Sequence, residues 1–143
     1  MATHVRPRDP RSVEAYADLV GPAALNVLQA LSAATTDLQQ VARRERTAAA
    51  PRTALQALAA YVAARHEIDA AIDRYIAILA LGGVSRTGIA TALGGVRPQS
   101  VTKRLAGQPL AHARGSDLIR SEDGSWSVYA AGSPILDHAA EAG

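Results

Sequence analysis

Apolar residues recur along residues 12–81 at the three- and four-residue spacing of amphipathic helices. A first short helix is expected to end at Gly21-Pro22, because proline disrupts a helix interior and suits the first turn of the next helix. That next helix carries leucines at helical spacing, and Pro51 ends it. Residues 53–81 then predict one long helix, whose apolar positions are Leu55, Leu58, Val62, Ile68, Ile72, Ile76 and Leu79.

The pattern changes after residue 82 to short helices joined by tight turns. Ser85 is a suitable N-cap for a helix over residues 86–93, and Gly94-Gly95 tolerates the positive φ of a turn. A second helix is expected to start at Pro98, to run through Leu105 and to end at Gly107. The positions predicted to face inward are Ile89, Ala90, Leu93, Val96, Val101 and Leu105.

A β-hairpin signal follows residue 115. Asp123-Gly124 separates two β-prone runs, and both of these residues accept the positive φ of a two-residue turn. With this dipeptide at the centre of the turn, Ile119 is expected to face Val128. We expect the hairpin to pack on the helices of residues 82–107 that precede it, as the structural part of one head, through Trp126.

Composition favours a helical protein without disulfides. Hydrophobic residues make up 48% of the 143 positions, yet phenylalanine is absent and alanine dominates. Alanine is the best helix former and a poor strand former, which favours closely packed helices over a β-sandwich. The absence of cysteine excludes disulfides, thiolate metal sites and cysteine nucleophiles. No apolar stretch reaches the ~20 residues of a membrane span and no signal peptide precedes the helices, so a cytoplasmic location without membrane contact is expected.

The residues that carry enzyme chemistry are scattered along the chain. No two histidines have the spacing of a zinc site on one helix; they are His4, His66, His112 and His138. The carboxylates Glu67, Asp69 and Asp73 lie on one predicted helix without a second cluster to complete a site. Since no nucleophile elbow or phosphate-binding loop is present either, the sequence predicts neither an enzyme nor a cofactor or metal.

Charge is unevenly distributed, although the net charge is only +2. Residues 82–116 contain basic side chains but no Asp or Glu, whereas acids cluster just upstream. The outward face of the predicted helix 98–105 holds Gln99, Ser100, Thr102, Lys103 and Arg104. Donors and acceptors without a carboxylate suit the major groove of DNA. The alternative interpretation is a plain helical hairpin whose polar face is solvated.

The segment GVSRTGIATALGGVRPQSVTKRLAG resembles the helix-turn-helix of bacterial regulators, and the preceding RHEIDAAIDRYIAILALGGVS is similar to the lead-in helix of small actinobacterial proteins of that type. The segment departs from the usual pattern at Gly94-Gly95, where a single glycine is more common. The positions that carry the resemblance are Ile89, Ala90, Leu93, Gly94, Val96, Val101 and Leu105.

What this resemblance implies is sequence-specific binding to duplex DNA, usually as a dimer. If the motif docks as its relatives do, the residues nearest the base edges are Gln99, Thr102 and Lys103. Those placed for phosphate contacts are Arg97, Ser100 and Arg104 from the second helix and Arg86 from the first. Arg114 is a candidate contact beside the hairpin, together with His112 and Arg120. Glu122 and Asp123 would repel phosphate, which favours a structural hairpin over DNA contact at its tip.

The sequence therefore predicts an all-α protein with a small β-hairpin, in which an N-terminal helical region precedes a winged helix-turn-helix head. The expected divisions are a flexible arm at 1–11, a helical dimerisation region at 12–81, a DNA-binding head at 82–131, and a tail or short helix at 132–143. The expected function is transcriptional regulation by a homodimer bound to double-stranded DNA in the nucleoid. The alternative is a helical interaction or assembly protein, such as a phage or plasmid partition or packaging component.

Overall fold

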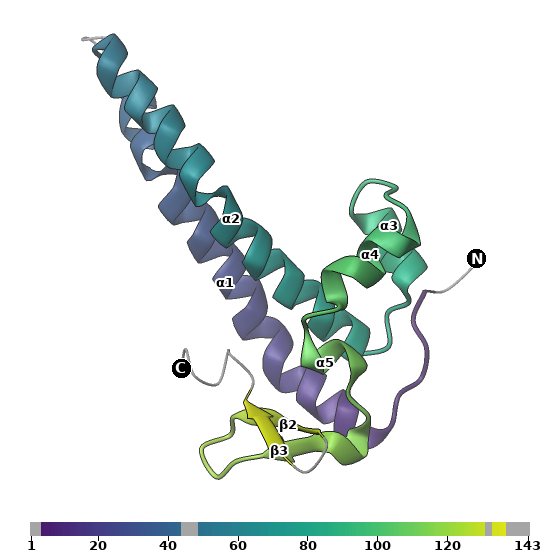
Figure 1. Ribbon diagram of the computed structural model, residues 1–143. Helices are drawn as coiled ribbons and strands as arrows, with labels where there is room; N and C mark the ends of the chain where they lie inside the picture. Colours follow the sequence, from purple (N-terminus) through teal and green to yellow (C-terminus); the bar gives the residue numbers. More distant parts are fainter. Residues whose placement is uncertain (1–3, 44–48, 131–132, 137–143) are drawn as a thin grey trace. The chain divides into compact units, whose positions relative to one another are not determined.

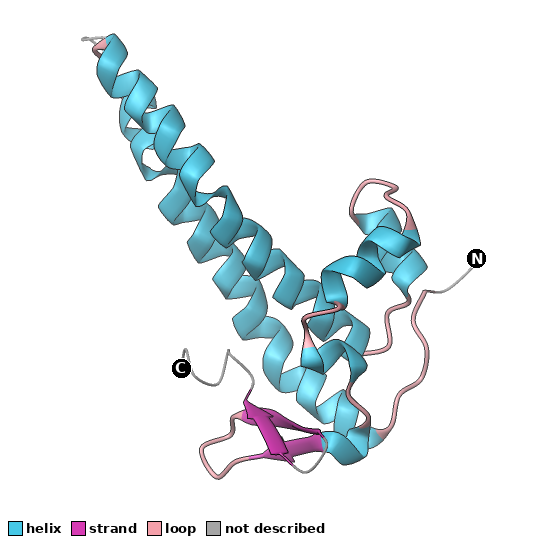
Figure 2. Cartoon of the chain, in the orientation of Figure 1, coloured by secondary structure: helices cyan, strands magenta, loops and turns pink. Residues whose placement is uncertain are grey.

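The computed structural model describes residues 4–43, 49–130 and 133–136, and shows a mostly helical chain with a small antiparallel sheet (Figure 1; Figure 2). It divides into two compact units, a head unit of residues 1–23 and 73–143 and a helical-pair unit of residues 24–72. The elements are α1 Pro10–Ala42, α2 Pro51–Leu81, α3 Arg86–Ala92, α4 Pro98–Leu105, α5 Pro109–His112, the 3-10 turn η1 Gly115–Asp117, β1 Leu118–Arg120, β2 Trp126–Ala130 and β3 Ser133–Leu136.

Helix α1 begins at Pro10 because Asp9 caps it, whereas the sequence predicts Ser12 as the cap. The Ser12 hydroxyl and backbone N–H both donate to the Asp9 carboxylate, at 2.8 and 3.1 Å. These two hydrogen bonds, led by the one from the hydroxyl, hold the pKa of Asp9 below its usual value. Pro10 occupies the first turn, where its missing N–H leaves no hydrogen bond unmade.

The predicted helix end at Gly21-Pro22 is wrong, since α1 continues through Pro22 to Ala42. A proline inside a helix costs about 3 kcal/mol through its lost hydrogen bond and its ring clash. Leu19 and Ala23 flank it and are both buried in the head core, while Pro22 itself is exposed. Tertiary packing on the inner face therefore overrides the local preference of the sequence.

The N-terminal segment is hydrogen-bonded in the structure, although the sequence predicts a flexible arm at 1–11. Val5 forms an antiparallel bridge with Val84, and the Arg6 N–H donates to the Gly83 carbonyl at 2.8 Å. Gly83 has a φ of 103°, and a Cβ there would run into the Arg6 carbonyl. Residues 4–8 thus form a strap across the end of α2; residues 1–3 lie outside the described part of the chain.

The hairpin forms as predicted, but its register differs by one residue. Leu118 rather than Ile119 pairs with Val128. The Ser121 N–H donates to the Ser125 carbonyl and the Gly124 N–H to Ser121, so the loop has three residues and Gly124 takes the positive φ of 87°. A three-residue loop with glycine in the left-handed region shifts the pairing relative to a two-residue turn.

A third strand replaces the start of the predicted C-terminal helix. Residues 133–136 form β3, which pairs antiparallel with β2 in the order β1-β2-β3. Of the two expectations for residues 132–143, a short helix is wrong over residues 133–136, and the residues after 136 lie outside the described part of the chain. Pairing with β2 satisfies the backbone N–H and C=O groups of this segment, and the local sequence pattern does not reveal that pairing.

The core of the head unit draws on both ends of the chain. Trp126 is 1% exposed, and its indole N–H donates to the Asp18 carboxylate on α1 at 2.9 Å. Trp126 is buried with Leu110 and Ala113 of the predicted head, and it also packs on α1, which the sequence assigns to a separate dimerisation region. The buried cluster comprises Ala15, Leu19 and Ala23 of α1, Ile78 and Leu81 of α2, and Leu110, Ala113, Leu118, Trp126 and Val128.

Among its described residues, the helical-pair unit buries mainly alanine and exposes several large apolar side chains. Its buried apolar residues are Ala34, Ala57 and Ile68, and burying an alanine removes little apolar area from water. The exposed large side chains of this unit are Leu25, Leu28, Leu31, Leu55, Leu58 and Val62. Of the two apolar stripes on α2, the one formed by Leu55, Leu58 and Val62 is exposed, whereas Ile68 and Ile76 of the other are buried. Among the described residues, no helix is both long and apolar enough to cross a membrane.

Candidate nucleic-acid interface

Helix α3 begins and ends as the sequence predicts. The Ser85 hydroxyl accepts a hydrogen bond from the Gly88 N–H at 3.0 Å, which satisfies one of the free donors of the first turn. At the other end the Gly94 N–H donates to Thr91 and the Gly95 N–H to Ala90. This pair of bonds is a Schellman motif, which requires a left-handed residue after the helix, and Gly94 supplies it with a φ of 95°.

The second glycine explains why Val96 does not return to the core. Gly95 also has a positive φ, of 85°, so the turn continues one residue beyond the Schellman motif. Val96 is consequently 40% exposed, and its predicted inward position is wrong. The predicted inward positions that are buried in the structure are Ile89, Ala90, Val101 and Leu105, while Leu93 is half-buried.

Helix α4 has one buried face and one exposed face. Pro98 is its first residue, and Val101 and Leu105 are fully buried one turn apart. This burial fixes the rotation of the helix about its axis, which decides the side chains that face solvent. The exposed polar residues are Gln99, Ser100, Thr102 and Lys103, preceded by the exposed Arg97.

The polar face of α4 presents no carboxylate of its own. Thr102 donates its hydroxyl to the Pro98 carbonyl at 3.3 Å, so its oxygen and methyl group remain for other contacts. Gln99, Ser100 and Lys103 have side chains that donate or accept hydrogen bonds in solvent. These four residues occupy one exposed helix surface, as the sequence predicts for them, whereas the fifth predicted member, Arg104, is only partly exposed.

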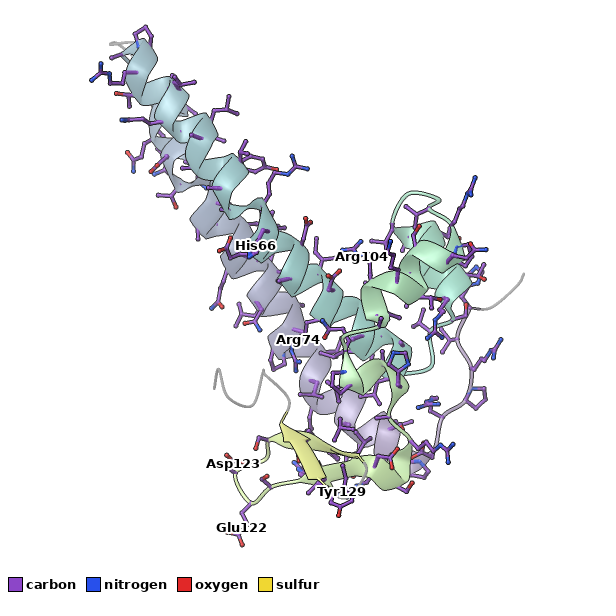
Figure 3. All side chains as sticks on the ribbon, viewed as in Figure 1. His66, Arg74, Arg104, Glu122, Asp123 and Tyr129 are labelled. Carbon is purple, nitrogen blue, oxygen red and sulfur yellow. The ribbon has the colours of Figure 1, made fainter. Side chains whose placement is uncertain are left out.

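Arg104 lies apart from this face and is held by the protein itself. Its Nε donates to the Asp73 carboxylate at 2.6 Å, with both side chains about one-third exposed. The ion pair ties the last turn of α4 to the end of α2 within the head unit; Figure 3 labels Arg104. The sequence does not reveal this pair, because a contact between residues 31 positions apart leaves no local pattern.

Arg86 and Arg114 belong to a different location. They line a cleft of about 440 Å³ together with Arg6, Arg8 and His112. Arg6 and Arg8 are not among the predicted contacts, since the sequence pattern of residues 1–11 predicts a flexible arm. The predicted contacts therefore separate into the α4 face, the Arg104 ion pair, this cleft, and Arg120 on the hairpin.

The β-hairpin presents little positive charge for DNA. Arg120 donates to Glu14 at 2.8 Å and lies 3.3 Å from Asp18, and its guanidinium stacks 5.8 Å from the Trp126 ring. Glu122 and Asp123 occupy the tip of the loop (Figure 3). The Ser125 hydroxyl and N–H hold the pKa of Asp123 below its usual value, which favours its negative form.

Comparisons of the chain with protein-family models, with curated proteins and with solved structures gave no match. Within the described ranges, no cluster of three or more His, Asp or Glu side chains is placed to hold a metal ion. The features that bear on function are therefore the α4 face and the cleft.

Proposed function

We propose that this chain binds double-stranded DNA sequence-specifically, with α4 in the major groove, and that it acts as a homodimeric transcriptional regulator in the nucleoid. The α3–α4 pair then serves as a helix-turn-helix in which α4 is the recognition helix. Gln99, Thr102 and Lys103 read base edges, while Arg97 and Ser100 contact phosphate. The β-hairpin corresponds to the wing, but it acts in packing rather than in DNA contact.

The observation that carries this proposal is the acid-free polar face of a helix whose opposite face is fully buried. Val101 and Leu105 are 0% exposed, so α4 has a fixed orientation, which a recognition helix needs. The one carboxylate that forms an ion pair with an α4 residue in the described chain, Asp73, faces Arg104 rather than the face itself. Glutamine and lysine at exposed positions match the bidentate donors and acceptors of adenine and guanine.

Arg104 takes a different role from the phosphate contact that its sequence position suggests. Its pairing with Asp73 supports a structural function that holds α4 in place. A salt bridge of two partly exposed groups contributes little free energy, in the range of 0–1 kcal/mol. Its contribution is mainly to the orientation of the last turn of α4.

The exposed leucines of the helical-pair unit support a second copy of the chain as the partner. Leu55, Leu58 and Val62 follow one stripe of α2 and are 53–65% exposed, although leucine and valine belong among the most often buried residues. Covering such a side chain fully stabilises a complex by about 1.5–3 kcal/mol. A dimer also presents two copies of α4, which matches two half-sites on one duplex.

The test begins with selection of bound sequences from random duplexes, followed by affinity measurements on the selected site and on a scrambled one. Gln99→Ala and Lys103→Ala are expected to weaken binding to the selected site by about 1–3 kcal/mol each, with little effect on the scrambled site. Gln40→Ala, an exposed glutamine on α1, is the matched control and should change neither affinity. Equal losses on both duplexes would assign Gln99 and Lys103 to the phosphate backbone and refute base readout.

The alternative function is a helical assembly protein whose α3–α4 pair contacts protein. The exposed leucines of the helical-pair unit favour it as much as they favour a dimer. Affinity for duplex DNA that falls steeply with salt supports the DNA-binding proposal, because phosphate contacts release counterions. Absence of any duplex binding at low salt supports the assembly function instead.

A further inference from the structure

The cleft that contains Arg86 and Arg114 concentrates positive charge from three segments of the head unit. Its volume is about 440 Å³, which lies within the range of roughly 300–1,000 Å³ typical of small-molecule sites. The charged or titratable side chains that line it are all basic or histidine: Arg6, Arg8, Arg86, His112 and Arg114.

The strap formed by residues 4–8 brings Arg6 and Arg8 to this place. The Arg6 N–H bonds to Gly83, and the Ser85 N–H bonds to the His4 carbonyl at 2.7 Å. Arg8 is fixed further by its side chain, since Nε donates to the Leu81 carbonyl at 3.2 Å and Nη2 to the Ala113 carbonyl at 3.1 Å. Backbone hydrogen bonds therefore fix the position of the strap, which supplies two of the arginines that line the cleft.

Carboxylates near the cleft are bonded to other groups. Asp9 accepts from the hydroxyl and N–H of Ser12, and Asp117 accepts from the Arg114 backbone N–H at 3.0 Å. Among the described residues, none of the four arginines that line the cleft forms an ion pair with a carboxylate. Four guanidinium groups that stay charged at every physiological pH thus make a local field that attracts anions.

We propose that this cleft binds the phosphate groups of a small phosphorylated ligand. Guanidinium groups present paired N–H donors that match phosphate oxygens, which makes arginine a preferred phosphate ligand. Arg6, Arg86 and Arg114 supply the ligand contacts, because Arg8 already donates to two carbonyls. His112 has a ring nitrogen 3.0 Å from the Leu105 carbonyl, so it lies between the cleft and the last residue of α4.

The same chemistry is present in the DNA backbone, which is the second source of phosphate for this cleft. The two sources differ in what they require. A free ligand binds in the absence of DNA, so its detection does not depend on the proposed function. A backbone phosphate reaches the cleft only when the duplex is bound elsewhere on the head, or when the cleft itself holds the duplex.

The experiment titrates the full chain with inorganic pyrophosphate and with adenosine triphosphate by calorimetry, without DNA. Saturable binding of either probe is expected, and Arg6→Gln or Arg114→Gln should weaken it about tenfold, since one charge-assisted contact is lost. Arg52→Gln, an exposed arginine of the helical-pair unit, is the matched control and should bind as the original chain does. Arg6 and Arg114 are both exposed, so neither substitution removes a buried side chain. Circular dichroism spectra and thermal midpoints equal to those of the original chain are the check that both variants fold.

A parallel titration with random duplex separates the two sources. If neither small probe binds, but Arg6→Gln and Arg114→Gln each weaken duplex binding and reduce the salt slope by about one, the cleft binds phosphate of the DNA backbone. If the two variants match the Arg52→Gln control with pyrophosphate, adenosine triphosphate and duplex alike, the cleft is not a phosphate site. That last result leaves the proposed role of Gln99 and Lys103 intact, because their test uses different residues and a sequence comparison.

Discussion

The two faces of α4 should separate stability from DNA binding when one residue on each face is changed to alanine. Leu105 is fully buried, whereas Lys103, two residues earlier, is exposed. Leu105→Ala removes three buried carbon atoms and leaves a cavity, which in protein cores costs about 2–5 kcal/mol. Lys103→Ala removes a solvated side chain and should change the free energy of unfolding by less than about 0.5 kcal/mol.

The magnitude for Leu105→Ala is large relative to the stability of a small domain, about 5–15 kcal/mol. A loss of about 3 kcal/mol corresponds to a fall in Tm of roughly 12–24 °C in a domain of this size. Trp126 is the single tryptophan of the chain and lies in the head core, so its fluorescence reports unfolding of the head unit directly. Urea titration followed by this fluorescence gives the free energy of unfolding of both variants.

DNA affinity is then measured at a temperature at which both variants are folded. Leu105→Ala should bind the selected duplex nearly as well as the original chain, while Lys103→Ala should bind it about 1–3 kcal/mol more weakly. If Lys103→Ala destabilises the head as much as Leu105→Ala does, its side chain is covered in the working assembly and the reasoning about the exposed face fails. If Leu105→Ala leaves the stability unchanged, α4 is not seated as described.

Two further predictions concern other parts of the molecule. Because the pKa of Asp9 is lower in the folded head, the stability that Asp9 contributes is present above its unfolded pKa and is lost as pH falls through its folded pKa. Asp9→Asn should therefore lower Tm at pH 7, and the difference in Tm from the original chain should shrink below about pH 4. Thermal melts followed by Trp126 fluorescence measure this difference, and a difference that is constant at every pH contradicts the prediction. Leu58→Glu should shift sedimentation towards the monomer with little change in monomer stability, since Leu58 is already 53% exposed. Val96→Glu, at an exposed position of the head unit, serves as the control. Unchanged assembly of Leu58→Glu contradicts a dimer through this surface.

The sequence predicts the α3–α4 segment well because its determinants are local. Ser85, Gly94 and Pro98 each act within one turn of their own position, through a cap, a left-handed residue and a fixed φ. Val101 and Leu105 follow from helical spacing alone. The exposure of Val96 escapes such reasoning, because it depends on how two adjacent glycines combine their positive φ values.

The errors occur where distant residues override a local signal. Pro22 reads as a helix end until the packing of its neighbours in the head core is known. The strap at residues 4–8 pairs with residues about 80 positions away in the chain. The sequence predicts β2 as one strand of a two-stranded hairpin, and it gives no sign that β3 pairs with the other edge of β2. The cationic cleft follows from the strap, so no pattern within the sequence brings Arg6 near Arg114.

The same long-range contacts also determine how α4 is oriented in the head unit. The sequence pattern suggests a head that begins at residue 82, but the compact unit also takes in residues 1–23 and 73–81. The indole of Trp126 bonds to Asp18, the side chain of Arg8 bonds to both Leu81 and Ala113, and Arg104 bonds to Asp73. Each of these contacts joins an early helix or the strap to a later segment. The orientation of α4 is thus set by residues on either side of it in the chain, and a ligand in the cleft would touch the strap that takes part in this arrangement.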